Sequence, residues 1–223
     1  HCRRRTAIGI EGRDGCFAQR IAVPAANLHA VPNGVADDVA VFAEPLAAAL
    51  QIIQQVRPSP RDTAVVIGDG RLGQLTAQVL ASRGLRPMVV GKSRDKLRRL
   101  ERLGIGVLDV AEARPRGETH LVVEASGSVE GLRMAIEFVR PRGTIVLKST
   151  LAVGEPLNLS PVVVNEVTIL GSRCGPLNEA LVTLANGAVS TDGLVSAVYP
   201  LSDGVKAMDA AMRPESLKVL IRP

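Results

Sequence analysis

Apolar runs and helical patterns alternate along the middle of the chain. Helical spacing of apolar residues covers 71–83, about 93–103 and 128–139. Short apolar runs, typical of strands buried on both faces, occupy residues 63–68, 86–91, 120–126, 143–149 and 167–172. Strands that alternate with helices pair in parallel, with helices on both faces of the sheet. The pattern therefore predicts an α/β fold, a doubly wound parallel sheet of the Rossmann type.

The chain before this alternation has a different pattern. Residues 5–45 are short stretches punctuated by glycine and proline. They predict a turn at Asp14-Gly15 followed by a strand that ends at Pro24. Over 45–58, a proline suited to the first helical position is followed by strong helix formers. This part predicts a β-rich segment without a core of its own, followed by one helix.

The chain changes character again after about residue 187. The remaining sequence predicts a strand in "AVYPLS", a short helix at 203–212 and a final strand at 216–222. We expect this end of the chain to pack with the N-terminal segment rather than to extend the parallel sheet.

A glycine-rich turn joins the strand at 63–68 to the helix that follows it. In dinucleotide-binding turns the first glycine permits the tight turn, the second lets the backbone approach a pyrophosphate, and the third lets the helix pack closely on the strand. The helix N-terminus then offers free N–H groups to phosphates. We therefore predict that a dinucleotide is bound by Gly68, Gly70, Arg71, Leu72 and Gly73. The alternative is a tight turn with incidental glycines.

The end of the second strand predicts which dinucleotide binds. An Asp or Glu here would hold the ribose 2′-hydroxyl of NAD, but the sequence reads Gly91, Lys92, Ser93 and Arg94. With no acid at this position to repel a 2′-phosphate, and with two cations and a hydroxyl to receive one, these residues favour NADP, with NAD as the alternative. The alternative role for the basic residues is to cap and solubilise the next helix.

Composition narrows the function classes. The net charge of +5 suits an anionic partner, and a phosphorylated cofactor is a simpler one than nucleic acid, since aromatic residues make up only 2% of the chain. The three cysteines form no CxxC pair, which fits a reducing, cytoplasmic setting. No apolar run reaches the roughly 18 residues of a membrane span. We expect neither a nucleic-acid nor a membrane partner.

With these features in place, nearly the whole chain resembles the zinc-dependent, medium-chain alcohol/polyol dehydrogenase superfamily, in particular its sorbitol- and threonine-dehydrogenase-like members. The resemblance is carried, in order and spacing, by "GIEGRDGCFAQRIAVPAANLHAVPNG", "VFAEPLAAALQII", "VVIGDGRLGQLTAQVLASRG", "VVEASGS", "GTIVLKST" and "VTILGSRCGP". It implies an oxidoreductase that transfers hydride between an alcohol or polyol CH–OH group and NAD(P). It also implies pairing into a homodimer or homotetramer.

The resemblance implies a division of the chain. Residues 1–45 would be the C-terminal remnant of a GroES-like catalytic domain. Residues 46–186 would form the Rossmann dinucleotide-binding domain, and residues 187–223 a return segment that packs with the catalytic domain.

The resemblance also assigns site residues. Glu44 falls where many members carry an acidic group at the catalytic zinc; the alternative is that it favours the N-terminus of the helix beside it. Arg173 follows the last strand of the nucleotide domain, and Lys218 is similar to a late basic residue that reaches the pyrophosphate. The positions that flank nicotinamide would be Ser126, Gly127, Ser149 and Thr150. For all of these except Glu44, an ordinary strand-end or surface role is nearly as good an interpretation.

The zinc half of the family pattern is incomplete. Cys2 matches the last of four cysteines in the family's structural zinc lobe, and the other three have no counterpart here. The family's first catalytic-zinc cysteine and its histidine have none either, while His29 and His120 match no ligand position. Since a single carboxylate cannot hold a zinc ion, we assign no catalytic residue and expect a truncated form of the enzyme. The alternative is a catalytically incompetent NADP(H)-binding module.

Overall fold

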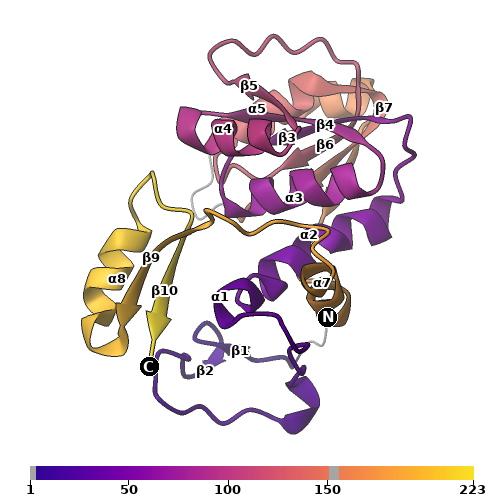
Figure 1. The fold of residues 1–223 in the computed structure, drawn as a ribbon. Coiled ribbons are helices and arrows are strands. Elements are labelled where there is room, and N and C mark those ends of the chain that lie inside the picture. The colour runs from indigo at the N-terminus through magenta and orange to yellow at the C-terminus, as the bar shows by residue number, and fades with distance from the viewer. Residues whose placement is uncertain (1–3, 151–155) are drawn as a thin grey trace. The chain divides into compact units, whose positions relative to one another are not determined.

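The computed structural model describes residues 4–150 and 156–223, and it divides into two compact units (Figure 1). One unit is Val31–Thr191, and the other combines His1–Ala30 with Asp192–Pro223.

A six-stranded sheet with every neighbouring pair parallel forms the centre of the larger unit. Its strand order is β5-β4-β3-β6-β7-β8, so that the chain moves outward in one direction, returns to the middle and then moves outward in the other. The strands are β3 (Thr63–Ile67), β4 (Arg86–Gly91), β5 (Gly106–Asp109), β6 (Thr119–Glu124), β7 (Val139–Leu147) and β8 (Thr168–Gly171). The predicted doubly wound α/β fold is confirmed.

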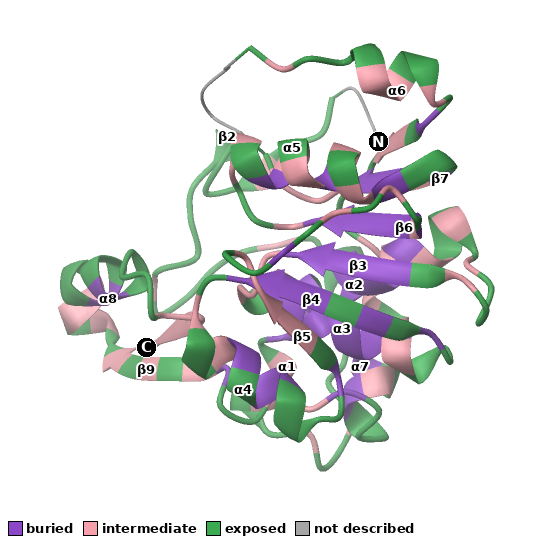
Figure 2. Cartoon of the chain, turned by 90° about the horizontal axis from the view of Figure 1, so that it is seen from above, coloured by how far each residue is buried: buried purple, intermediate pink, exposed green. Residues whose placement is uncertain are grey.

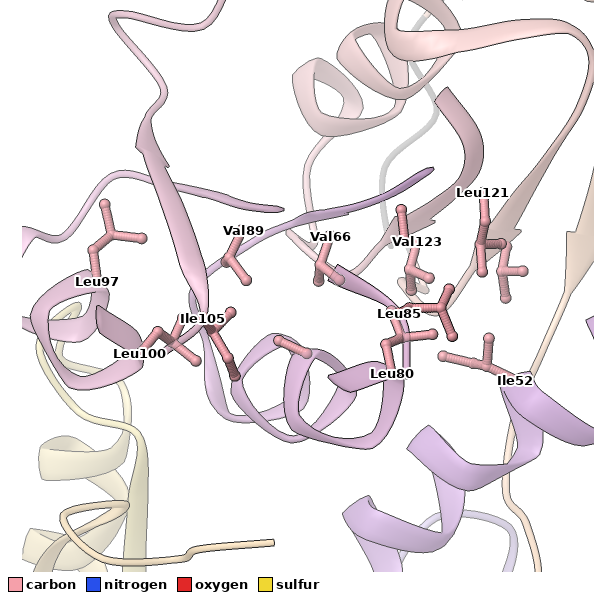
Figure 3. Close-up of a cluster of buried hydrophobic side chains, with 13 residues drawn as sticks. Ile52, Val66, Leu80, Leu85, Val89, Leu97, Leu100, Ile105, Leu121 and Val123 are labelled. Atoms are coloured by element: carbon pink, nitrogen blue, oxygen red, sulfur yellow. The ribbon is translucent and has the colours of Figure 1, made fainter. Parts of the chain in front are cut away.

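Helices cover both faces of this sheet. Successive strand residues point to opposite sides, so these apolar strands present side chains on both faces that the helices bury. On one face Val66, Val89 and Val123 pack with residues of the helices α2, α3 and α4, as Figure 3 shows. On the other face Val65 and Val122 pack against α5. The central strands are buried, whereas α4 and α5 also carry exposed residues (Figure 2). The helices of this unit are α1 (Asp37–Ala40), α2 (Ala43–Val56), α3 (Arg71–Ser82), α4 (Arg94–Arg102), α5 (Val129–Phe138), α6 (Ser160–Val164) and α7 (Leu177–Ala185).

Two features of these helices differ from the prediction. Helix α2 begins at Ala43, so Pro45 is its third residue rather than its first. All residues from Gly73 to Leu80 of α3 are buried, and Gln78 exchanges hydrogen bonds with the backbone of Ser190. The polar Gln74 is also buried within α3, so the face that apolar periodicity predicted is only part of the helix's packing surface.

The other unit contains short elements. Strands β9 (Val195–Pro200) and β10 (Lys218–Arg222) pair in parallel in a sheet of their own, and α8 (Gly204–Ala211) lies between them in the chain. The final strand therefore does not belong to the large sheet, in agreement with the prediction that this end of the chain would not extend it. The remaining elements are β1 (Ala7–Ile8), β2 (Gly12–Arg13), η1 (Ala25–Asn27) and η2 (Leu201–Asp203).

The predicted strand ending at Pro24 is absent from the described residues. Residues 16–24 form no ladder, and Phe17 and Ile21 are 64% and 49% exposed. A strand needs a neighbour to satisfy its backbone N–H and C=O groups, and no described segment pairs with this one. The apolar pattern of this segment did not show that no neighbouring strand would pair with it.

Candidate functional site

A cavity of about 280 Å³ opens at the carboxyl ends of β3, β4 and β6. Strand β3 pairs with β4 on one side and β6 on the other, so the direction of the strand order reverses at this point. In open α/β sheets, ligands bind outside the carboxyl ends of the strands at such a switch point. The glycine turn after β3 contributes Gly68 and Gly70 to the lining, while the ends of β4 and β6 contribute Gly91 and Ser126.

The first and third glycines of the turn are required by contact. Gly68 has a φ of +114°, and a Cβ there would lie 2.6 Å from the carbonyl oxygen of Ala125, at the end of β6. A Cβ on Gly73 would collide with the carbonyl oxygen of Gly68. The first turn of α3 therefore rests directly on the glycine loop, the close packing that the third glycine of a dinucleotide turn permits.

The second glycine is required for a different reason. Gly70 is the N-cap of α3, with φ −68° and ψ 177°, a conformation that any residue adopts. A Cβ there would meet no atom within 4 Å. Gly70 nevertheless lines the cavity, so its missing side chain keeps open the space in front of the N–H groups at the helix N-terminus. Arg71 and Leu72 are the first two residues of α3, and Arg71 is exposed.

A carboxylate lies at the end of β4, where the sequence led us to expect none. Asp69, inside the glycine turn, accepts hydrogen bonds at Oδ2 from the backbone N–H groups of Lys92 (2.8 Å) and Ser93 (2.7 Å). A Cβ on Gly91 would lie 2.5 Å from the same oxygen. The expectation that this strand end lacks a carboxylate is therefore wrong. The acid comes from the neighbouring loop, because adjacent parallel strands lie only about 5 Å apart.

The predicted basic residues follow directly. Lys92 is exposed and lines the cavity, Ser93 is the N-cap of α4, and Arg94 is the first, exposed residue of that helix. Lys96 of α4 also contributes to the lining. The edge of the cavity at β4 thus combines a fixed carboxylate with several cations.

The end of β6 holds a second carboxylate, which the sequence analysis did not predict as a site residue. Glu124 is only 1% exposed, and its Oε1 accepts hydrogen bonds from the backbone N–H (2.7 Å) and the hydroxyl (2.6 Å) of Ser126. The Ser126 hydroxyl is also 3.1 Å from that of Ser128, the N-cap of α5. Next to it, Gly127, at φ +74°, donates its N–H to the Ser149 hydroxyl (2.8 Å). Three of the four residues predicted to flank nicotinamide therefore come together, and Thr150 follows them as an exposed residue.

Lys148, just after β7, makes hydrogen bonds to α2 and to the residue that follows β8. Its Nζ donates to the carbonyl oxygen of Ala48 (2.8 Å) and to the hydroxyl of Ser172 (3.1 Å). Burial lowers the pKa of the Lys148 ammonium to about 8, although the charges of Cys174 and Glu44 act in the opposite direction. Glu44 itself is exposed in the first turn of α2.

The remaining predicted residues lie in other parts of the chain. Arg173 is exposed in the loop after β8 and is not part of the lining. Lys218 opens β10 in the other compact unit, and Cys2 lies outside the described residues. His120 Nδ1 lies 2.8 Å from the hydroxyl of Thr63 at the start of β3, at the opposite end of the strands.

The described residues do not form a zinc site. Among residues 4–150 and 156–223, no three His, Cys, Asp or Glu side chains come together as a metal-binding group. Glu44 is the one predicted ligand, and a catalytic zinc takes three protein ligands and an open position. Across the same residues, no helix combines the length and hydropathy that a membrane crossing needs.

Some functional candidates were missed because their signal is weak in a single sequence. Asp69 occupies a variable position of the glycine motif, and only its pairing with a glycine at position 91 distinguishes it. Glu124 and Lys148 each place a charge at the end of an apolar strand, in "VVEAS" and "IVLKS". A charge at the carboxyl end of a buried parallel strand is a usable signal, because that edge of the sheet carries the ligands.

Comparisons with known proteins agree with this geometry. The profile of the family described as zinc-binding dehydrogenase matches residues 72–186, more than half of the chain. Sorbitol dehydrogenase from Halalkalibacterium halodurans is 29% identical over all of this chain and 69% of its own length. A Sinorhizobium meliloti protein, described as a zinc-binding dehydrogenase and bound to NADP, superposes with a TM-score of 0.89 at 26% identity, covering 100% of this chain and 70% of that one. An Escherichia coli alcohol dehydrogenase complexed with NADH shares the fold, with a TM-score of 0.83 at 21% identity, covering 95% of this chain and 67% of that one.

Proposed function

The chain belongs to the zinc-binding dehydrogenase family, and from that premise we propose that its cavity binds NAD(P) for hydride transfer to and from an alcohol or polyol. The observation that carries the proposal is the glycine turn. Gly68 and Gly73 allow a close contact between loop and helix, and Gly70 leaves open space at the helix N-terminus. This arrangement lies at the switch point of a doubly wound sheet, where dinucleotides bind.

In this proposal, different parts of the cavity bind different parts of the dinucleotide. The N–H groups at the start of α3 hold the pyrophosphate, since the dipole and the N–H donors of a helix N-terminus favour an anion. The end of β4 holds the adenine ribose. The segments around Ser126, Gly127 and Ser149 border the nicotinamide side, where Glu124 fixes Ser126 through two hydrogen bonds. When bound, the nicotinamide ring supplies the acceptor for a hydride from the carbinol carbon, while the hydroxyl proton leaves to solvent and a carbonyl product forms.

The substrate class comes from the relatives rather than from the cavity. Sorbitol dehydrogenase acts on a polyol by its name, and we carry that class over to this chain as a small-molecule alcohol or polyol. Its CH–OH group would approach the nicotinamide side. Glu44, Arg173 and Thr150 keep their predicted roles as parts of this proposal.

Different features of the site favour NADP and NAD. Lys92 and Arg94 favour NADP, as predicted, and the Sinorhizobium meliloti protein was solved with NADP. The Asp69 carboxylate at the same strand end favours NAD. The proposed function holds with either dinucleotide.

A second candidate is a module that binds the dinucleotide without turning it over. It is favoured by the lack, among the described residues, of three side chains that could hold a metal ion. Both candidates predict binding, and they differ in catalysis.

The experiment has two stages. NADH and NADPH are first titrated into the 223-residue chain, with nucleotide fluorescence as the readout and Gly70→Ala as the variant that fills the pyrophosphate space. Binding that the variant weakens supports the cavity assignment, and failure of both nucleotides to bind would refute the proposal. Oxidation of sorbitol and related polyols is then followed at 340 nm with added zinc: turnover favours the enzyme, and binding without turnover favours the module.

A further inference from the structure

The structure points to Asp69 as the residue that selects the dinucleotide, and we propose that it makes this chain prefer NAD(H) over NADP(H). The inference rests on the proposed function, and it reverses the preference that the basic residues alone suggest. It begins from the two hydrogen bonds that Asp69 makes to the end of β4.

A bound 2′-phosphate needs hydrogen-bond donors. Phosphates in proteins are held by backbone N–H groups together with cationic side chains. At the end of β4, the N–H groups of Lys92 and Ser93 point to Asp69 Oδ2, at 2.8 and 2.7 Å. The place where backbone donors could receive a 2′-phosphate is therefore already filled by an anion of the chain itself.

The Asp69 carboxylate and the neighbouring cations differ in how strongly water screens their charges. Asp69 is half-buried and fixed by two hydrogen bonds, whereas Lys92 and Arg94 are exposed. Charges on exposed, mobile side chains are screened by water and salt, but a fixed, partly buried charge is screened less. The carboxylate therefore determines the local preference: it repels a 2′-phosphate and can accept a hydrogen bond from a 2′-hydroxyl. Both bonds end on Oδ2, so these two N–H groups leave Oδ1 for that role.

Position 91, where the ribose-binding acid usually lies, carries glycine because Asp69 occupies the space of its side chain. An Asp or Glu at position 91 would be the ordinary ribose-binding acid. Here a Cβ at Gly91 would lie 2.5 Å from Asp69 Oδ2 and 2.7 Å from Asp69 Cβ. Asp69 and a side chain at position 91 therefore exclude each other. The acid has not been lost from this strand end; it is supplied from the adjacent loop, and Gly91 makes room for it.

The test separates cofactor choice from binding in general. The probes are NADH and NADPH, followed by fluorescence, and ADP-ribose with its 2′-phosphorylated counterpart, followed by calorimetry. The second pair lacks nicotinamide, so its binding does not depend on catalysis. We expect the wild-type chain to bind the unphosphorylated member of each pair at least tenfold more tightly than the phosphorylated member.

The main variant is Asp69→Asn, which keeps an acceptor for the two N–H groups and removes the charge. It should shift the affinity ratio at least tenfold toward the phosphorylated probes. Asp95→Asn is the control, because it removes an equal charge from an exposed residue that pairs with Arg98 on α4; it should leave the ratio unchanged. Asp69→Gly combined with Gly91→Asp moves the acid to the usual position and should restore the preference for NADH, whereas Gly91→Asp alone should bind both dinucleotides poorly.

The outcomes are distinct. A wild-type chain that prefers NADPH would overturn the inference, as would an Asp69→Asn variant that weakens both probes in equal proportion, since that is the effect of a merely structural residue. Failure of all four probes to bind the wild-type chain would instead overturn the proposed function, and the inference with it.

Discussion

Alanine at the third glycine of the turn is expected to lower stability, whereas alanine at the second glycine is expected mainly to weaken dinucleotide binding. Position 73 lies in the first turn of α3, where Gly→Ala ordinarily stabilises a helix by about 0.5–1 kcal/mol. A Cβ there, however, would collide with the carbonyl oxygen of Gly68 and lie 2.9 Å from its carbonyl carbon. Because both atoms belong to backbone that cannot rotate away, the loop or the helix must shift.

The magnitude follows from those contacts. Overpacking of this kind costs about 1–3 kcal/mol, which exceeds the gain in helix propensity, so Gly73→Ala should lower the free energy of unfolding by about 1–2 kcal/mol. At position 70 a Cβ meets nothing within 4 Å, and alanine is at most about 1 kcal/mol worse than glycine at an N-cap. Gly70→Ala should therefore lose less stability than Gly73→Ala, at most about 1 kcal/mol, yet bind NADH at least tenfold more weakly, since its methyl group enters the space proposed for the pyrophosphate.

Urea denaturation followed by circular dichroism measures the first quantity, and NADH fluorescence titration measures the second. Gly70→Ala is the matched control for Gly73→Ala, because both add one methyl group to the same turn. A Gly73→Ala protein as stable as the wild type would refute the close contact between loop and helix. A Gly70→Ala protein that binds NADH with unchanged affinity would refute the placement of the pyrophosphate.

Three further predictions concern the surroundings of the cavity. Burial lowers the pKa of Lys148 from 10.5 to about 8, so between these pH values the unfolded chain binds more protons than the folded chain, and this group makes stability rise with pH. Lys148→Met should abolish this contribution to the rise in urea midpoints between pH 7.5 and 9.5. Lys206→Met should not, because Asp203 raises the pKa of Lys206. Gln74→Leu should cost about 1–3 kcal/mol of stability, because buried Gln74 donates to the carbonyl oxygen of Lys96 and accepts from Arg99; exposed Gln55→Leu should change stability by less than about 0.5 kcal/mol. After incubation with zinc and dialysis, metal analysis should find well under one zinc per chain, and one tightly held zinc per chain would contradict the incomplete ligand set.

Elements with a strong local signal were predictable, and those that depend on distant partners were not. Strand β4 at Arg86–Gly91 and helix α3 at Arg71–Ser82 agree with the predicted ranges almost to the residue, because apolar runs and a glycine turn bound them. The short β5 gave no separate signal, since it is four residues long and only partly buried. The segment before Pro24 carried the pattern of a strand, but pairing decides whether such a segment forms one, and the pattern does not encode the partner.

The candidate site divides in the same way. The three glycines were identified because their spacing and their position between strand and helix are fixed by backbone sterics. The environment of Lys148 depends on Ala48, a hundred positions away in the sequence, and on Ser172 in the loop after β8. No local pattern indicates that these atoms meet, so the half-buried ammonium became visible only in the folded chain.

Asp69 shows why cofactor choice is harder to predict than cofactor binding. The usual rule examines one position, the end of the second strand, and there it finds Gly91. Because the glycine turn and that strand end lie on adjacent parallel strands, a short side chain from either position can place its carboxylate at the same point. Gly91 has no room for a Cβ while Asp69 is present, so the two positions are expected to vary together among relatives. Relatives with an acid at position 91 should carry a small residue at 69, and a relative with bulky side chains at both would contradict the exchange.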